Sequence, residues 1–260
     1  MTSALEHAKA LYLTGIRDGE PRRAVAEHTG ERYTQHSTGV KDGPEGFVEF
    51  FEAFLERNPE REIDIVRAFA DGDLVFMHAA QRLNGGESRW ITMDILQADA
   101  DGRMIEHWDV IAEWVDESVS GHSQIDGATE PIDLHRTELN KALVSDFIRD
   151  VLTDGKADRI TDYISTESYI QHNPLVGDGL DGLSTFLSRL AADGGSMVYL
   201  ETPLVVGNGD MVATLSRVDL SGTEMAVMDL FRVADGRIVE HWDVMEPVPA
   251  ADELVNSGKF

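Results

Sequence analysis

A ten-residue string occurs twice in this chain, and this repeat constrains the fold more than any other feature of the sequence. DGRMIEHWDV spans Asp101 to Val110, and DGRIVEHWDV spans Asp235 to Val244. A second pair of strings, YTQHSTGVKDGPEG from Tyr33 and YIQHNPLVGDGLDG from Tyr169, recurs at nearly the same offset. Two matching offsets indicate one unit of roughly 110 to 120 residues copied in tandem, which is a domain duplication and not a solenoid.

The boundary between the copies is indicated by composition. The stretch ESVSGHSQIDGATEPIDLH, from Glu117 to His135, is rich in Ser, Gly, Thr and Pro and lacks apolar periodicity, as expected of a connector. We therefore predict a first domain at residues 1–117, a linker at 118–131 and a second domain at 132–260. A length of 260 residues agrees with two domains of ordinary size.

Charge and composition argue against several classes of partner. The chain has 48 Asp and Glu against 22 Lys and Arg, a formal net charge of -26, which repels nucleic acid and anionic membranes. It contains no cysteine, so disulfides and thiolate chemistry are excluded. The N-terminal stretch lacks the pattern of a signal peptide, and no run of about 18 apolar residues occurs. We expect a cytoplasmic protein without nucleic-acid or membrane partners.

Each copy has helical patterns first and strand patterns afterwards. Apolar residues recur at helical spacing in the opening segments and again in GFVEFFEAFLER and GLSTFLSRL. The later segments, such as REIDIVRAFA, DLVFMHAAQRL and SRWITMDILQAD, resemble strands separated by Asp-Gly turns. This order predicts an α+β domain in which a curved antiparallel sheet wraps around helices.

The order of YIQHNP, GDGLDGL, a helix and MDLFRVADGRIVEHWDV resembles the SnoaL-like branch of the NTF2-like superfamily, in two tandem copies. The resemblance implies two cone-shaped α+β barrels, each a bent antiparallel sheet closed by helices around an apolar cavity. Similar members include polyketide cyclases that close a ring by aldol condensation. The wider superfamily also includes steroid isomerases, epoxide hydrolases, dehydratases and modules without catalysis, so the fold alone does not determine the reaction.

Strand geometry assigns the residues of EHWDV to two faces. Side chains alternate along a strand, so His107 and Asp109 share one face while Glu106 and Trp108 share the other. The second copy places His241 and Asp243 in the same way. We predict His107, Asp109, His241 and Asp243 as catalytic residues that line the two cavities.

The preceding strand contributes Asp94 in the first copy and Asp229 in the second, and we predict that both bind substrate. A two-residue turn at Asp235-Gly236 would place Asp229 opposite Trp242, on the wrong face. A three-residue loop that includes Ala234 would place Asp229 opposite His241, and we favour this loop. The first copy has one extra residue and requires a longer loop or a bulge.

The Y-x-Q-H strings add polar groups near the expected mouth of each cavity. His36 and His172 are predicted as further catalytic residues. His78 is predicted to add an imidazole in the first copy, where the second copy has Leu215. The remaining predicted substrate-binding residues of these strings are Tyr33, Gln35, Tyr169 and Gln171.

These residue types suit proton abstraction next to a carbonyl group. Burial raises the pKa of a carboxyl group toward working pH, which makes it a better base, and His, Tyr or Gln can donate to an enolate oxygen. A metal held by His36, His78, His107 and Asp109 is the less favoured interpretation, because their spacing is not a known ligand signature. We expect no cofactor and no metal.

Two functions are compatible with this pattern. The first is a SnoaL-like enzyme that acts as an aldol cyclase or isomerase on a small or polycyclic apolar carbonyl compound. The second is a non-catalytic module that binds a small apolar ligand. Because related domains pair through their sheets, we also expect the two copies to form an intrachain pseudo-dimer, with a homodimer of whole chains as a further option.

Overall fold

The computed structural model describes residues 2–260, which divide into two compact units. Unit 1 contains the described residues up to 113 together with the tail 248–260, and unit 2 contains residues 114–247. The segment predicted as a linker, 118–131, is therefore counted with unit 2. The tail, predicted as part of the second domain, is counted with unit 1.

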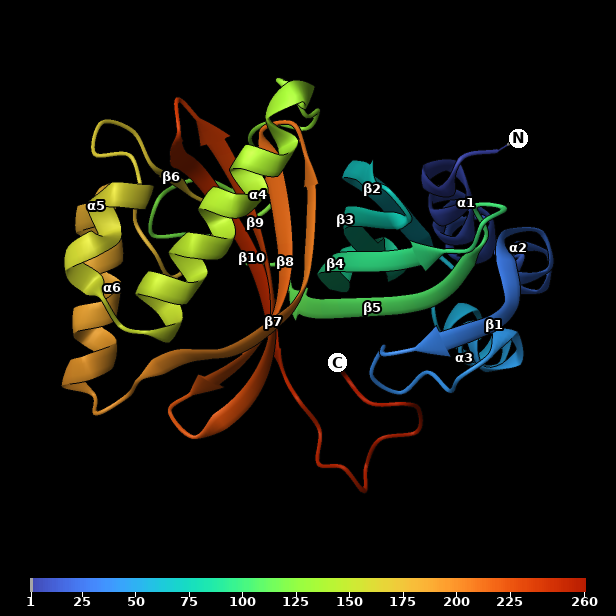
Figure 1. The fold of residues 1–260 in the computed structure, drawn as a ribbon. Coiled ribbons are helices and arrows are strands. Elements are labelled where there is room, and N and C mark those ends of the chain that lie inside the picture. Colours follow the sequence, from blue (N-terminus) through green and yellow to red (C-terminus); the bar gives the residue numbers. More distant parts are fainter. Residues whose placement is uncertain (1) are drawn as a thin grey trace. The chain divides into compact units, whose positions relative to one another are not determined.

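Unit 1 is a five-stranded sheet with helices on one face (Figure 1). The strand order is β1-β5-β4-β3-β2, and β1 pairs with β5 in parallel while the other pairs are antiparallel. The helical elements are α1 (Ala4–Ala10), the π-helical η1 (Leu11–Arg17), α2 (Pro21–His28), α3 (Pro44–Arg57) and the 3₁₀ turn η2 (Asn84–Gly86). The strands are β1 (Thr29–Gln35), β2 (Arg61–Asp71), β3 (Leu74–Leu83), β4 (Ser88–Ala98) and β5 (Met104–Glu113).

Unit 2 repeats this topology with the strand order β6-β10-β9-β8-β7 and a parallel pair β6–β10. Its helical elements are η3 (Leu134–Arg136), α4 (Thr137–Phe147), η4 (Ile148–Thr153), η5 (Ala157–Arg159), α5 (Ile160–Tyr163) and α6 (Gly179–Ala192). Its strands are β6 (Ile170–Gln171), β7 (Met197–Asn208), β8 (Met211–Leu220), β9 (Thr223–Ala234) and β10 (Arg237–Pro247). The predicted tandem α+β fold is confirmed, with one parallel pair in each sheet that the sequence did not indicate. No helix among residues 2–260 is long and apolar enough to cross a membrane.

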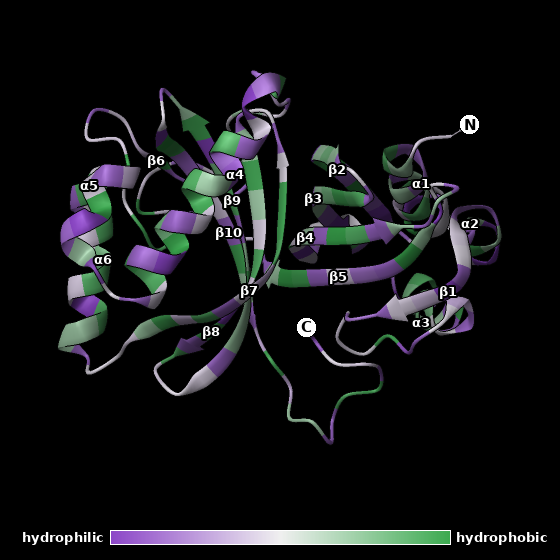
Figure 2. Ribbon diagram, viewed as in Figure 1, coloured by the Kyte–Doolittle hydropathy of each residue, from purple (hydrophilic) through white to green (hydrophobic). Residues whose placement is uncertain are grey.

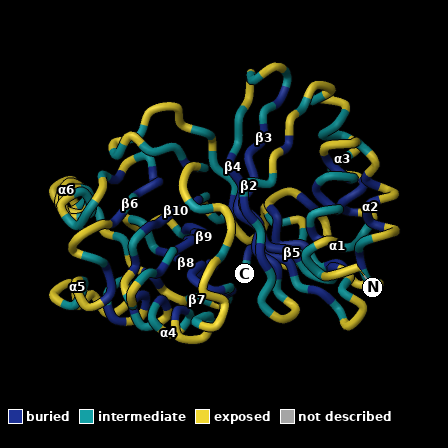
Figure 3. Tube along the Cα trace, turned by 90° about the horizontal axis from the view of Figure 1, so that it is seen from above, coloured by how far each residue is buried: buried dark blue, intermediate teal, exposed yellow. Residues whose placement is uncertain are grey.

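The helices bury one apolar face against the sheet of their own unit. Apolar and polar residues alternate along the strands and around the helices (Figure 2). In α3, Phe47, Phe51 and Phe54 recur at helical spacing and pack with the core of unit 1. The corresponding α6 of unit 2 has no buried residue and is coloured as exposed or intermediate in Figure 3. The two units therefore share a topology but cover their sheets differently.

In the β9–β10 hairpin, Asp229 lies on the expected face of the sheet, although the turn differs from the predicted one. Asp235 and Gly236 form a two-residue turn with φ of 51° and 72°, and Ala234 pairs with Arg237. The predicted three-residue loop is therefore wrong. The register shifts between Ile238 and Glu240, and this bulge returns Asp229 to the face of His241, directly opposite Asp243.

The first copy accommodates its extra residue with both a longer turn and a bulge. The segment from Asp99 to Arg103 forms a longer turn, closed by a 2.8 Å hydrogen bond from Asp99 N to Arg103 O. The register also shifts between Gln97 and Ala98, which faces Met104. Asp94 consequently lies directly opposite Asp109, as Asp229 lies opposite Asp243.

The second glycine of each GPEG or GLDG string is required by close backbone packing. A Cβ at Gly46, inside α3, would collide with the carbonyl group of Lys41, and a Cβ at Gly182 would collide with that of Gly177. Helix propensity alone favours alanine over glycine by about 0.5–1 kcal/mol. We expect the opposite sign here: Gly46→Ala should lower the free energy of unfolding by about 1–3 kcal/mol, measured by urea denaturation.

A matched change in the same helix, Ala53→Gly, controls for propensity and should cost about 1 kcal/mol. If Gly46→Ala instead stabilises the protein, then the contact with Lys41 does not restrict this position.

Candidate functional site

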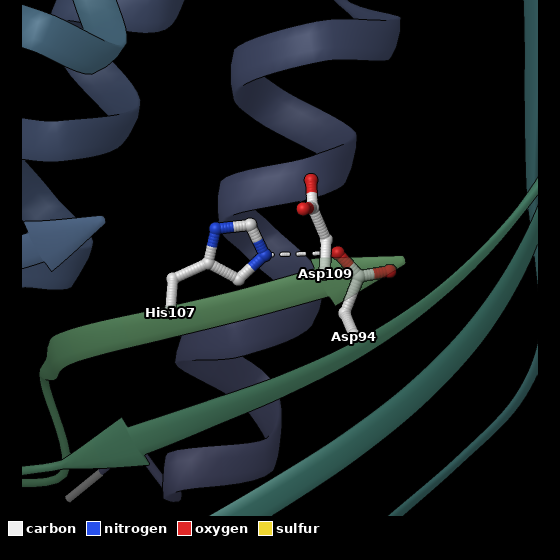
Figure 4. A group of neighbouring side chains, drawn as sticks. All are labelled: Asp94, His107 and Asp109. Carbon is white, nitrogen blue, oxygen red and sulfur yellow. Dashed lines mark hydrogen bonds and ion pairs between the residues drawn. The ribbon is translucent and has the colours of Figure 1, made fainter. Parts of the chain in front are cut away.

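Three side chains from β4 and β5 form a buried polar cluster on the helix-covered face of unit 1. Asp94 and Asp109 lie directly across the strand pair, and His107 is two residues before Asp109 (Figure 4). His107 Nε2 is 2.9 Å from Asp94 Oδ1. All three side chains are nearly inaccessible to solvent. We call this set the Asp94 cluster.

The Asp94 carboxylate is held from several directions and does not line the cavity described below. The Tyr12 hydroxyl, from η1, donates to its two oxygens at 2.9 and 3.0 Å, and the Thr92 hydroxyl donates at 3.0 Å. Burial raises the pKa of Asp94, against the hydrogen bonds from His107 and Tyr12, which favour the charged form. Asp94 thus orients His107, and Tyr12 is a site residue that the sequence analysis missed.

Asp109 has different neighbours and faces a cavity. Ser37 Oγ donates to Oδ2 at 2.6 Å, and Lys259 Nζ lies 3.1 Å from Oδ1. Burial raises the pKa of Asp109, but the charge of Lys259, the His107 imidazole and the Ser37 hydrogen bond together outweigh it and hold the pKa below its ordinary value. The expected upward shift is therefore not found at Asp109.

A cavity of about 410 Å³ lies in unit 1 beside this cluster. Its polar lining includes Gln35, Ser37, His107 and Asp109. Most of its wall is apolar, and its aromatic residues are Tyr12, Tyr33, Phe47, Phe50, Phe51, Phe54 and Trp90. A mostly apolar cavity with a few converging polar groups is typical of a small-molecule site.

Gln35 reaches the site because β1 runs parallel to β5. Gln35 pairs with His107, and its Oε1 lies 3.0 Å from His107 Nδ1. The side chain is fully buried, and its Nε2, which acts on the Tyr33 hydroxyl, makes no well-aligned hydrogen bond within residues 2–260. Since a buried amide with incomplete hydrogen bonding is costly, this group is a candidate donor to a ligand. Tyr33 stacks over His107 with ring centroids 6.4 Å apart.

His36 and His78 are not brought to this site, which corrects the prediction for both. His36 follows Gln35 and therefore lies on the other face, where it stacks on Trp108 with centroids 4.8 Å apart and its Nε2 lies 3.0 Å from Glu106. His78 pairs with Met93, one position away from the register of Asp94, so it faces the opposite side of the sheet and contacts Arg67.

Unit 2 contains the equivalent Asp229, His241 and Asp243. His241 Nε2 lies 3.0 Å from Asp229 Oδ1. The hydroxyl donor to Asp229 is Tyr199, from β7, at 3.2 Å from both oxygens. Asn173 Nδ2 donates to both oxygens of Asp243, at 2.9 and 2.8 Å. Burial raises the pKa of Asp243, despite the nearby His241.

Gln171 is fully used inside unit 2, unlike Gln35. Its Oε1 accepts from the backbone amides of His172 and Asn173 at 3.1 and 3.2 Å, and its Nε2 donates to the Tyr169 hydroxyl at 3.2 Å. These bonds fix Oε1 as the atom 2.9 Å from His241 Nδ1, so that nitrogen must donate. The other ring nitrogen faces the Asp229 carboxylate. This arrangement favours the protonated ring of His241.

The second outward histidine, His172, is also placed away from the cluster of its unit. It stacks on Trp242 with centroids 4.6 Å apart, and its Nε2 lies 3.0 Å from Glu240. Its Nδ1 lies 2.7 Å from the carbonyl oxygen of Ser123. The predicted convergence of His172 with His241 and Asp243 does not occur, because consecutive residues of β6 and β10 face opposite sides of the sheet.

The ligand atoms of Asp94, His107 and Asp109 lie within 4.8 Å of one another, as do those of Asp229, His241 and Asp243. Both histidines make a direct hydrogen bond to a carboxylate, and Asp109 is paired with Lys259. We therefore interpret each set as a hydrogen-bonded network rather than as metal ligands. The four-ligand set considered from the sequence is not assembled, because His36 and His78 lie on the other face.

The fold and these paired clusters place the chain among NTF2-like α+β proteins with a helix-covered cavity. A family model of the SnoaL-like domain matches residues 11–107 and again residues 144–241, together more than half of the chain. The protein therefore belongs to the SnoaL-like family and carries two such domains in tandem.

Several solved structures are similar to part of the chain. A candidate polyketide cyclase from Bacillus cereus is 19% identical over 42% of this chain and 73% of its own, with a TM-score of 0.37. IdmH, a candidate polyketide cyclase from Streptomyces antibioticus, is 22% identical over 41% and 91%, with a TM-score of 0.33. An LEH-like epoxide hydrolase of M. tuberculosis is 21% identical over 42% and 82%, with a TM-score of 0.35. Comparison with curated proteins gives no significant match. Identities this low do not transfer an activity.

The imidazolium of His241 can be tested by titration. Burial lowers the pKa of His241, but the hydrogen bond to Asp229 and the charge of Asp243 outweigh burial and raise it. Its contribution to stability is therefore fully present below about pH 6.5, the unfolded pKa, and is lost as the pH rises through the folded pKa. We expect Asp229→Asn to lower the pKa of His241, measured by NMR of the ring nitrogens.

The matched control is Asp162→Asn, because Asp162 is an exposed carboxylate paired with Arg159 in the same unit. It should leave the His241 titration unchanged. An unchanged titration in Asp229→Asn as well would show that the Asp229 carboxylate does not hold the charged imidazole.

Proposed function

We propose that unit 1 is an enzyme active site that removes a proton next to a carbonyl group, as in an aldol cyclase or an isomerase. The observation that carries the proposal is that Asp109 and the fully buried Gln35 line the same cavity. A base and a hydrogen-bond donor are the two groups that enolate formation requires. The mostly apolar wall, with its seven Phe, Tyr and Trp residues, suits a small or polycyclic apolar carbonyl compound.

Each polar residue then has a defined role. Asp109 takes the proton from the carbon atom next to the carbonyl, and Gln35 Nε2 donates a hydrogen bond to the carbonyl oxygen as negative charge develops there. Asp109 then returns the proton to the substrate. His107, oriented by Asp94 and stacked under Tyr33, meets Gln35 Oε1 and so orients the Gln35 amide. The low pKa of Asp109 keeps it in the base form at neutral pH, although it lowers its intrinsic basicity.

The glutamine and the cavity favour unit 1 as the reactive one. Gln171 satisfies both ends of its amide within unit 2, whereas Gln35 lines the cavity of unit 1. The aspartates do not distinguish the units, because Asn173 holds both oxygens of Asp243 and Ser37 and Lys259 hold those of Asp109. We infer that the cluster in unit 2 maintains the fold of that unit. The predicted catalytic roles of His241 and Asp243 are therefore not part of the proposed reaction.

The second candidate function is the binding of an apolar ligand without turnover. The aromatic wall of the cavity in unit 1 supports it, since apolar burial alone can hold such a ligand. The two functions differ in one observable, which is the exchange of hydrogen at the carbon next to the carbonyl.

The test of the base is a panel of apolar ketones in deuterium oxide, followed by NMR. We expect exchange with the native protein and a loss of about 10²- to 10⁴-fold in Asp109→Asn, because a general base contributes about that factor. The matched change in unit 2, Asp243→Asn, should retain most of the exchange. Exchange that survives Asp109→Asn would exclude Asp109 as the base, and binding without exchange would favour the ligand-binding module.

The donor role of Gln35 is tested with the best substrate of the panel. Gln35→Leu removes the amide at similar size, and we expect kcat to fall by about 10²-fold while KM changes less, since the hydrogen bond strengthens in the transition state. Gln97→Leu is the control, because Gln97 is paired with Glu106 on the other face of the sheet and bonds to Asp73. Equal kcat values in Gln35→Leu and the native protein would argue against the donor.

A further inference from the structure

The tail, residues 248–260, is held in unit 1 by a set of specific bonds. Asn256 Nδ2 donates to the carbonyl oxygens of Ser37 and Val40 at 2.7 and 2.8 Å. Ser257 Oγ donates to Asp42 at 2.8 Å, and the carbonyl oxygen of Gly258 meets His36 Nδ1. All of these partners lie between residues 36 and 42, the segment that leads from β1 to α3. The position of the residue that follows Gly258 is therefore closely defined.

That residue is Lys259, and its ammonium group is buried. The side chain is 1% exposed, with Nζ 3.1 Å from Asp109 Oδ1 and 3.5 Å from the Thr38 hydroxyl. Removing an ammonium group from water is costly unless a carboxylate and further hydrogen bonds compensate. Lysine side chains usually keep their charge in solvent, so this burial requires the partner that it has.

We propose that Lys259 is a positioning residue of the active site, which holds Asp109 ionised and fixes the rotamer that faces the cavity. The inference rests on the proposed function of Asp109, but the contact itself does not depend on it. After Asp109 takes a proton, the ammonium group stays beside the cavity wall. Its positive charge then stabilises the negative charge that has developed on the substrate.

The two units provide an internal comparison for this role. Asp109 and Asp243 occupy equivalent positions, opposite Asp94 and Asp229. Asp109 is paired with Lys259, whereas Asp243 accepts from the neutral amide of Asn173. The pKa of Asp109 lies below its ordinary value and that of Asp243 above it, although burial raises both.

Other groups around Asp109 act on the same carboxylate and must be held constant in any test. Burial is the largest single effect on the pKa of Asp109 and raises it, whereas Lys259 and the His107 imidazole both lower it. The titratable groups that face Asp109 are Asp94 from β4, His107 from β5, Tyr12 from η1, Tyr33 from β1 and Lys259 from the tail. Substitution of Lys259 leaves the first four in place.

The experiment is a carbon-13 NMR titration of the Asp109 carboxyl group in the full chain, with native protein and Lys259→Met. We expect the titration midpoint of Asp109 to rise by at least about one pH unit, a tenfold change in proton affinity. Lys259→Gln, which keeps a hydrogen-bond donor without the charge, should show the same direction and guards against misfolding of the methionine variant. Lys259→Arg should restore the native titration.

The matched control is Lys41→Met, because Lys41 is an exposed lysine of the same unit paired with Glu49. It should leave the Asp109 titration unchanged. A native midpoint in a folded Lys259→Met or Lys259→Gln variant would overturn the proposal.

A kinetic measurement separates this inference from the proposed reaction. With a substrate that exchanges, the acidic limb of the pH–rate profile should move to higher pH in Lys259→Gln and return in Lys259→Arg, which loss of packing alone would not produce. If no ketone exchanges, the proposed function fails while the titration still tests the role of Lys259. If exchange occurs but neither the acidic limb of the pH–rate profile nor the Asp109 titration moves, then Lys259 does not position Asp109. The assignment of Asp109 as the base would still stand.

Discussion

The alternation of side chains along β5 and β10 is the constraint on which both units depend. One face of the EHWDV strand presents His and Asp to the helix-covered side, and the other face presents Glu and Trp to an outward histidine. The parallel pairing with β1 or β6 applies the same alternation to the Y-x-Q-H string. Glutamine therefore joins the inner cluster, and the next residue, histidine, joins the outer one. A one-residue shift of either strand would exchange the two sets.

The outer sets explain why the whole string is repeated rather than only its His and Asp. In unit 1 the histidine that stacks on Trp108 meets the carbonyl oxygen of Gly258. In unit 2 the histidine that stacks on Trp242 meets the carbonyl oxygen of Ser123, and Trp242 Nε1 donates to that of Asp126. The repeated Glu and Trp thus support a histidine that holds a segment without regular secondary structure, while the repeated His and Asp face the interior.

The fold and the inner clusters could be predicted from the sequence because they depend on periodicity and duplication. The facing of His107 with Asp109 follows from a period of two, which needs no tertiary information. The side of the sheet on which His36 lies could not be predicted from this period, because it depends on the parallel pairing of β1 with β5, which the sequence did not indicate. Asp229 was predicted on the correct face, but from the wrong loop length. The turn has two residues, and a bulge near Val239 restores the register. Tyr12 and Lys259 are distant in sequence from the motif, and no local pattern connects them to it.

The segment after each repeat belongs to the compact unit of the other repeat, and this arrangement limits how the chain can evolve. Each half of the sequence repeat is followed by a stretch that packs in the other compact unit: residues 114–131 in unit 2 and residues 248–260 in unit 1. Loss of either copy would therefore remove contacts from the copy that remains, including the partner of His36 or of His172. Once the duplicated gene had acquired these contacts, the two copies could diverge in their inner polar clusters, but loss of one copy would destabilise the other.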